Sequence, residues 1–529
     1  MVRANRMSWG FRMRVLARRL LAGCLVLGLT RPVWAADLAA NTTTALIFFD
    51  ASGNQSLDPA EPQSTSGQAQ LPLIAIYDSL VGLDAPGNLV PKLALSWRYN
   101  ADLTEFTLTL RPGVTFHDGT KFDAAAVAAN LARGKALGTR AGTTILDTVN
   151  RIASVEVVSS DTIRLKLNEP NGQMPYLLAA QGGMMIGPDS LAADGFGASL
   201  KPVGTGPYRV KSFDAAVRTI AERFDAYWGG IEGRPAAMEH HFVPEAAARL
   251  NALRSGQINL ALIDPRQIPD AKAAGLTVQV NEKDSVWDIY PNGGRPPLNN
   301  LKVRQALMYA LNRAEIAEAL GFGAAKPTVQ LYSAASPLYD PTLENLYPYD
   351  PAKAKALLAE AGYKDGIDIS WLILNTSEYK LLSQAIQAMA AESGIRLKFD
   401  IVDVSQYTLF HKPPGRGDMF MGRWGGRGDP LQTFQEVGGT GGSVNAGGAV
   451  VPAIDKLLRE ARLLDASDPK RVAILRAVSR LMTEQVAHIP VMTRSNVYAF
   501  RPGCITNLPP YLPTGSDRLN DTRIGVNCK

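Results

Sequence analysis

Two kinds of hydrophobic pattern alternate along the chain. Apolar residues occupy every second position at 106–110 and at 276–280, which is the period of a half-buried β-strand. From residue 303 to residue 317 they recur at intervals of three and four, which predicts one helix whose apolar stripe lies on a sheet. The pattern therefore predicts a mixed α/β fold.

Capping residues and short apolar runs add further elements. Asp123 opens a helix that we expect to stop at Gly134, and the Asp350-Pro351 pair opens one that we expect to stop at Gly362. We also expect strands at 45–49, 154–158, 162–167, 369–374, 395–402 and 491–500, and helices at 244–255, 378–393, 452–464 and 469–485. Strands and helices alternate as in βαβ units, and no repeat of about 20 to 50 residues indicates a solenoid or a propeller.

The stretch 419–434 combines these elements with side chains suited to binding. An apolar run ends at a glycine-rich bend that carries Arg423, Trp424 and Arg427. Asp429, which is followed by proline, then marks the start of a helix. An indole, two guanidiniums, bare glycine amides and a helix N-terminus predict recognition of a polar small molecule, anionic ones included. The alternative is structural: Arg427 pairs with Asp429, and Trp424 fills a core.

The composition is that of an ordinary globular protein with more than one domain. The chain has 529 residues, of which 46% are hydrophobic and 20% charged. A net charge of +6 and a pI near 9.0 suggest a nucleic-acid partner. Residues 1–35, however, hold seven Arg and no Lys, Asp or Glu, so subtracting these seven charges leaves −1. We therefore expect no nucleic-acid partner.

Residues 1–35 have the three parts of a secretory signal peptide. A basic beginning is followed by an apolar run at 20–29 and by a small-residue site that ends at Ala35. We expect cleavage after Ala35 and export to the periplasm. A twin-arginine signal at 18–19 and a start at Met13 stay open as alternatives. No later apolar stretch reaches about 18 residues, so we expect a soluble mature chain.

Three cysteines bear on the destination and on metal binding. Cys24 lies in a segment that also resembles a lipoprotein box, and this alternative stays open. Cys504 and Cys528 are candidates for a disulfide in an oxidising compartment. Two cysteines cannot form a four-thiolate zinc site, and the five histidines show no HExxH spacing, so we expect no metal and no cofactor.

A succession of sequence words resembles a known family. Residues 76–81 read IYDSLV, residues 93–97 read LALSW, and residues 106–127 read FTLTLRPGVTFHDGTKFDAAAV. The words VGTGPY at 203–208 and VRQA at 303–306 follow. In this order they resemble the family-5 extracellular solute-binding proteins, which are the peptide, nickel and oligosaccharide receptors of ABC importers. The resemblance covers nearly all of the chain after the signal.

The resemblance implies a two-lobed periplasmic binding protein fold, type II-like and enlarged by an extra domain. The ligand cleft is expected between the lobes, which are joined by a two-segment hinge, and a bound ligand is expected to favour closure. The expected segments are 36–80, 202–292 and 495–529 for a discontinuous first lobe, 81–201 for the extra domain, 293–494 for the second lobe, and 289–292 and 492–495 for the hinge.

The resemblance also places the glycine-rich bend at the cleft. Peptide-binding relatives usually carry an acidic residue just before the Asp-Pro pair, where this chain carries Arg427 in a bend that is one residue shorter. Because a guanidinium binds carboxylates and repels an ammonium group, we predict that Arg427 binds an anionic group and that ordinary dipeptides bind poorly. Trp424 is expected to stack on the ligand, and Trp287 to pack from the opposite lobe, although both also suit a core. Arg423 is a further candidate contact, and Asp429 is either a cap or a contact.

The function that follows is that of a monomeric solute-binding component of an ABC importer. It would capture a peptide-like or other polar solute and deliver it to a membrane permease with its cytoplasmic ATPase. An exported hydrolase is the main alternative, but the nearest nucleophile elbow, at 441–445, lacks its last glycine, so we expect no enzyme activity. A sensor or chaperone on the same fold stays open.

Overall fold

The structure is a computed structural model. It describes residues 44–51, 53–62, 70–191, 201–282, 285–334, 336–403, 406, 408–411, 415–445, 451–510, 518–525 and 527–528. The expected signal peptide, its cleavage after Ala35 and the alternatives at Cys24 and Met13 lie outside the described residues. From Ala39 onward the chain forms one compact unit.

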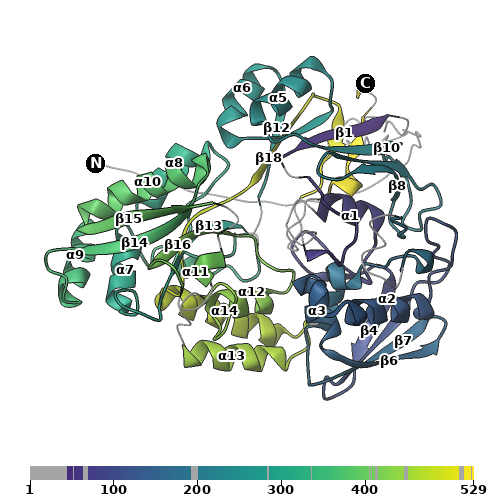
Figure 1. Cartoon of the computed structure of the whole chain (residues 1–529), viewed down its shortest axis with the longest axis horizontal. Coiled ribbons are helices and arrows are strands. Elements are labelled where there is room, and N and C mark those ends of the chain that lie inside the picture. The colour runs from purple at the N-terminus through teal and green to yellow at the C-terminus, as the bar shows by residue number, and fades with distance from the viewer. Residues whose placement is uncertain are drawn as a thin grey trace, which may run out of the picture. The chain divides into compact units, whose positions relative to one another are not determined.

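A seven-stranded sheet is built from distant parts of the chain (Figure 1). Its order is β12 (Thr277–Asn281), β18 (Asn496–Phe500), β11 (Leu260–Ile263), β1 (Ala45–Asp50), β10 (Ala237–Phe242), β9 (Arg218–Arg223) and β8 (Tyr208–Asp214). The central strand β1 runs parallel to both of its neighbours, β10 and β11. The helices that accompany this sheet are α1 (Leu71–Ile76), α5 (Ala246–Ser255) and α6 (Ile268–Ala273). The expected strands at 45–49 and 276–280 are thus confirmed.

A four-stranded antiparallel sheet occupies the segment assigned to the extra domain. Its order is β4 (Ala94–Tyr99), β5 (Glu105–Leu110), β7 (Thr162–Leu167) and β6 (Ile152–Ser159), accompanied by the β2 (Val81–Leu83) and β3 (Leu89–Pro91) hairpin and by α3 (Thr143–Val149) and α4 (Met174–Ala179). Helix α2 (Ala124–Leu137) starts at the Asp123 cap as expected, but it does not stop at Gly134. A Cβ on Gly134 would lie 2.9 Å from a methyl group of Val149, so this glycine lets α3 pack closely. The helix ends at Gly138, which has a φ of 52°.

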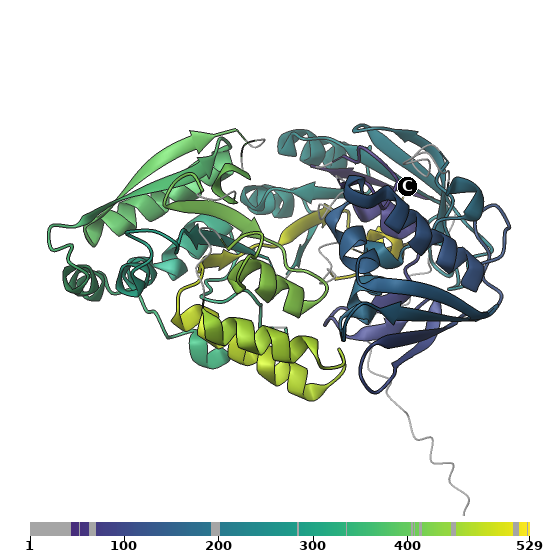
Figure 2. The same cartoon turned by 60° about the horizontal axis from the view of Figure 1, so that its bottom comes forward.

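A five-stranded sheet carries the stretch singled out in the sequence. Its order is β15 (Ile395–Val402), β14 (Ile367–Leu374), β16 (Met419–Trp424), β13 (Val286–Pro291) and β17 (Ile489–Thr493). Helix α10 (Ser377–Glu392) joins the parallel strands β14 and β15, which confirms the βαβ unit. The other helices of this part are α7 (Leu301–Tyr309), α8 (Arg313–Gly321), α9 (Pro351–Glu360), α11 (Thr408–His411), α12 (Pro430–Gly438), α13 (Pro452–Arg462) and α14 (Pro469–Glu484). Helices α13 and α14 lie side by side (Figure 2).

The expected helix at 303–317 is two helices, α7 and α8. The apolar stripe continues through both, so the pattern alone does not show the break. Asn312 marks it, because its side chain caps α8 by accepting a hydrogen bond from the backbone N–H of Glu315.

The chain passes between the seven-stranded and the five-stranded sheet twice. It leaves β12 at Asn281 and enters β13 at Val286, and it leaves β17 at Thr493 and enters β18 at Asn496. The expected strand at 491–500 is therefore two strands in different sheets. The second crossing agrees with the expected hinge at 492–495. The first precedes the expected 289–292, because those residues already belong to β13 or follow it.

The two crossings run next to each other. Strand β12 pairs with β18 in one sheet, and β13 pairs with β17 in the other, both antiparallel. Between these pairs the backbone N–H of Arg494 donates to the carbonyl of Ser285 at 2.7 Å. The connection is thus a two-stranded strap. The expected bounds of the two lobes and of the extra domain stay a prediction, and β13 begins before residue 293, where the second lobe was expected to begin.

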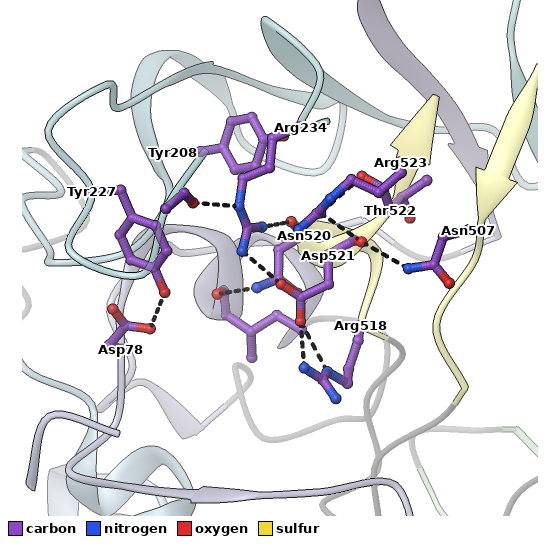
Figure 3. Close-up of polar contacts among 12 residues, drawn as sticks. Asp78, Tyr208, Tyr227, Arg234, Asn507, Arg518, Asn520, Asp521, Thr522 and Arg523 are labelled. Atoms are coloured by element: carbon purple, nitrogen blue, oxygen red, sulfur yellow. Dashed lines mark hydrogen bonds and ion pairs between the residues drawn. The ribbon is translucent and has the colours of Figure 1, made fainter. Parts of the chain in front are cut away.

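The C-terminal segment is fastened to the seven-stranded sheet part of the molecule. Cys504 and Cys528 form a disulfide, as predicted, beside the small sheet of β19 (Ile505–Asn507) and β20 (Arg523–Ile524). The buried Arg234 guanidinium donates to the carbonyl of Asn520 and pairs with Asp521 at 2.9 Å (Figure 3). Arg234 therefore ties this segment to the loop before β10.

Two further observations concern membranes and metals. In the described part of the chain, no helix combines the length and the apolar character needed to span a bilayer. Within the same residues, His, Cys, Asp and Glu side chains do not gather in threes as they would around a metal ion.

Candidate functional site

A crevice of about 240 Å³ lies where the carboxyl ends of strands from both large sheets come together. Ala51 follows β1, and Asp264 follows β11, its parallel neighbour. Ser377 follows β14, which is parallel to β16 in the other sheet. Residues 492–497 of the second crossing complete the lining. Ligands of α/β proteins bind outside the carboxyl ends of parallel strands, so this crevice is the candidate site.

Trp287 forms an apolar part of the crevice wall. It lies on β13, is 3% exposed, and meets the Tyr379 ring edge-on at 5.0 Å. Arg423 is opposite Trp287 in the antiparallel pair of β13 and β16, so both side chains lie on the same face of the sheet. The Arg423 guanidinium is 5.7 Å from the Trp287 ring centre and 5.6 Å from that of Tyr379. These two sequence-predicted residues are thus brought together. Trp287 was expected to pack from the lobe opposite Trp424. This expectation is wrong, because β13, which carries Trp287, and β16, which carries Trp424, are paired strands of one sheet.

Charged side chains surround this wall. Arg266 pairs with Asp264 at 2.8 Å, and both line the crevice. The Arg266 guanidinium holds the pKa of Asp264 below its ordinary value, so the carboxylate stays ionised at neutral pH. Glu378, in the first turn of α10, lies 3.7 Å from Arg423. Arg494 of the second crossing also lines the crevice. The site therefore presents both guanidinium donors and carboxylate acceptors to a solute.

Trp424 lies on the other face of the same sheet. It is opposite Val286 in the strand pair, one position out of phase with Trp287, and it is buried. The Arg427 guanidinium lies 5.2 Å from the Trp424 ring centre. The structure therefore places Trp424 in a core position and separates it from Trp287.

Arg427 is held by Glu436 of α12. Its Nη2 donates to Glu436 at 2.7 Å, and its Nε donates at 3.1 Å. Burial alone would lower the pKa of Arg427, but Glu436 raises it above its ordinary value, so the guanidinium stays charged. Arg427 borders a second crevice of about 330 Å³, between the bend, the turn before β3 and α14. Whether it also binds a ligand anion stays a prediction.

Asp429 is a buried helix cap. Its carboxylate accepts from the backbone N–H of Leu431 at 3.0 Å and pairs with Arg471 at 2.7 Å. Gln173, from the extra-domain segment, donates to it at 2.7 Å. The capping prediction is confirmed, and the alternative of an Arg427–Asp429 pair is wrong, because each residue has another partner. The protein's own donors surround the Asp429 carboxylate, which does not line the first crevice.

Sequence reasoning missed several residues of the crevice. They are Asp264, Arg266, Phe322, Glu378, Leu381 and Arg494. One signal was present: the short apolar run 260–263 ends in an Asp-Pro pair, which marks the carboxyl end of a buried strand. The crossings that bring both sheets to one crevice leave no comparable mark in the sequence.

The fold and the crevice define a class of protein. Two α/β sheets joined by a two-stranded strap, with a lined crevice between their strand ends, are the architecture of a two-lobed binding protein. The model of the bacterial extracellular solute-binding proteins, family 5 (middle region), matches residues 88–445, and the chain belongs to this family. It is therefore a solute-binding protein of an ABC transport system and not an enzyme.

Relatives and solved structures agree with this assignment. The glutathione-binding protein GsiB of Salmonella paratyphi A is 32% identical over 356 residues, which cover 66% of this chain and 68% of the relative. The structure of NikA from Brucella suis in complex with Fe(III)-EDTA matches with a TM-score of 0.78 and 22% identity, covering 91% of this chain and 99% of NikA. AgaA from A. tumefaciens in complex with agropinic acid matches with a TM-score of 0.73 and 26% identity, covering 91% and 98%. The expected fold class is confirmed.

Proposed function

We propose that the protein captures a small solute that carries carboxylate groups, in the crevice between the two large sheets. The observation that carries the proposal is the composition of the crevice. Arg266 of the seven-stranded part and Arg494 of the crossing line the crevice, and Arg423 stands next to the lining, over the ring of Trp287. A solute that binds all three guanidiniums would hold the two parts together, which is how ligand binding favours a closed form.

The carboxylates of the crevice narrow the class of solute. Asp264 and Glu378 suit an ammonium group, so a zwitterionic, peptide-like compound with excess negative charge fits best. The names of two relatives support this: GsiB is called glutathione-binding, and AgaA was solved with agropinic acid. We infer that a periplasmic pool supplies the solute and that a membrane permease receives it. Loss of glutathione uptake on deletion of the gene would favour transport over sensing.

Glutathione binding tests the site directly. Arg266→Gln and Arg423→Gln are each expected to weaken glutathione binding about tenfold to a hundredfold, because a hydrogen bond to a charged group is lost. Isothermal titration calorimetry measures the dissociation constants. Arg427→Gln in the same series tests the sequence prediction, since a similar loss would assign an anion contact to Arg427.

A matched control separates site effects from surface charge. Arg396 pairs with Asp368 on an exposed part of the five-stranded sheet and does not line the crevice, so Arg396→Gln should bind glutathione as the wild type does. Unchanged affinity in Arg266→Gln and Arg423→Gln would refute this site assignment.

Closure makes a separate prediction at Gly172, in the extra-domain segment. Its backbone N–H donates to the carbonyl of Arg462 at 3.0 Å, and a Cβ at this position would overlap the carbonyl oxygen of Leu464. If closure brings these segments together, Gly172→Ala should weaken glutathione binding at least about tenfold without touching the crevice.

Small-angle scattering and calorimetry measure this effect. The ligand-bound radius of gyration of Gly172→Ala should stay above that of the wild type. Gly425→Ala is the control, because a Cβ there meets nothing within 4 Å. Identical affinity and scattering in wild type and Gly172→Ala would show that this contact does not depend on closure.

A further inference from the structure

Phe322 occupies a backbone conformation that favours glycine. It follows α8, has a φ of 47°, and lies between Gly321 and Gly323. A bulky residue in the left-handed region is an outlier, and such residues cluster at functional sites. Helices commonly end in this conformation with glycine, which would take the position without strain. The chain instead places an aromatic ring there.

The Phe322 side chain borders the crevice. The residue is 40% exposed, although an aromatic side chain of this size favours burial. Its helix also contributes Leu320 to the lining. A strained aromatic residue that exposes this much of its surface at the crevice suggests a contact with the solute.

Leu381 is a second exposed apolar residue at the same crevice. It lies on α10, one turn after Glu378, and is 45% exposed. Leu382 and Met492 line the crevice beside it and are buried. Apolar surface from α8, α10 and β17 therefore meets the charged groups of Arg266, Glu378 and Arg494 in one crevice.

We propose that the crevice recognises an apolar group on its solute through Phe322 and Leu381, so that the solute is an amphipathic anion. The inference rests on the proposed function, which supplies the anionic end of the solute. A purely polar solute would leave both side chains in water or bury them without gain. An apolar substituent beside its carboxylates would cover them and be stabilised by that burial.

Glutathione and S-hexylglutathione test this inference, because they carry the same charges near neutral pH and differ by one alkyl chain. A fully buried methylene strengthens binding about fourfold. The wild type is therefore expected to bind S-hexylglutathione at least about tenfold more tightly than glutathione, even with the chain partly covered. Isothermal titration calorimetry gives both constants.

Two variants assign the preference to the named residues. In Phe322→Gly, which suits the left-handed backbone and keeps the fold, and in Leu381→Gln, the two compounds should bind within about threefold of each other. Leu463→Gln is the matched control, because Leu463 is exposed but lies outside the crevice.

Each outcome decides one point. Equal affinities of the wild type for the two compounds overturn the apolar contact and leave the proposed function standing, because glutathione still binds. A preference that persists in both variants overturns the assignment to Phe322 and Leu381. Binding of neither compound overturns this inference together with the peptide-like solute class.

Discussion

Asp429→Asn is expected to lower the free energy of unfolding by about 3–5 kcal/mol, because it leaves a charged Arg471 buried without its counter-ion. The side chains of Arg471 and Asp429 are 2% and 1% exposed, and their closest atoms are 2.7 Å apart. Asparagine caps a helix about as well as aspartate, so the cap of α12 should persist, while the oxygen that accepts from Gln173 loses its charge. Urea denaturation followed by circular dichroism measures the loss.

A more exposed ion pair provides the control. Arg480 and Asp340 also form a pair, but the Arg480 side chain is 43% exposed, so Arg480→Gln should cost less than about 1 kcal/mol. Glutathione affinity distinguishes the structural role of Asp429 from a ligand contact. Asp429→Asn that keeps its stability and loses glutathione binding would support the ligand contact and contradict the buried ion pair.

Arg234→Met is expected to lower the free energy of unfolding by about 2–4 kcal/mol, because it removes a buried donor of several hydrogen bonds and leaves Asp521 with Arg518 as its partner. Arg234 also donates to the carbonyl of Gly230 in its own loop. Its guanidinium reaches Asn520 and Asp521 of the C-terminal segment (Figure 3). Without these bonds the chain around Asn520 loses its main link to the loop before β10. Urea denaturation measures the free energy of unfolding of Arg234→Met. Arg209→Met is the control, because Arg209 forms an exposed ion pair with Glu222 on the seven-stranded sheet.

The pH dependence gives Arg234→Met a second readout. Burial alone would raise the pKa of Asp521, but Arg518 and Arg234 outweigh it and hold the pKa below its ordinary value. The ionised carboxylate therefore stabilises the fold above the unfolded-state pKa of about 4, and this contribution is lost as the pH falls through the lower folded-state pKa. In Arg234→Met the folded-state pKa of Asp521 should move toward the unfolded-state value, so the loss of stability with acid should be smaller and should end at a higher pH. Superimposable pH profiles of wild type and variant would contradict this role of Arg234.

Local signals in the sequence predicted much of the fold. Asp429 and Asp350 start helices as expected, because a side-chain cap depends on neighbouring residues alone. The apolar residues of β5 and β12 recur at every second position, so the local sequence alone predicts both strands. The predictions were wrong where tertiary structure, not the local sequence, explains a pattern. Gly134 does not end helix α2 but allows α3 to pack closely. The apolar run at 491–500 is not one strand but two, which belong to different sheets.

The candidate site was less accessible from the sequence. Trp287 and Arg423 were both candidates, but their meeting on one face depends on the register between β13 and β16, which lie more than a hundred residues apart. Trp424 directly follows Arg423 in the sequence but lies on the other face of the sheet, and the guanidinium of Arg427 lies over its ring. Arg266 could be recognised as a crevice residue only once the carboxyl ends of strands from the two sheets were known to come together. That arrangement depends on the topology of the whole fold.

The paired crossings also bear on how such a receptor is assembled from its gene. The chain from β13 to β17 starts and finishes on neighbouring strands, with Ser285 and Arg494 a hydrogen bond apart. It is one continuous segment whose two ends lie next to each other. A segment with another binding surface could therefore replace it without changing the path of the rest of the chain. Exchange of this one segment between family members would replace the five-stranded side of the crevice in a single recombination event.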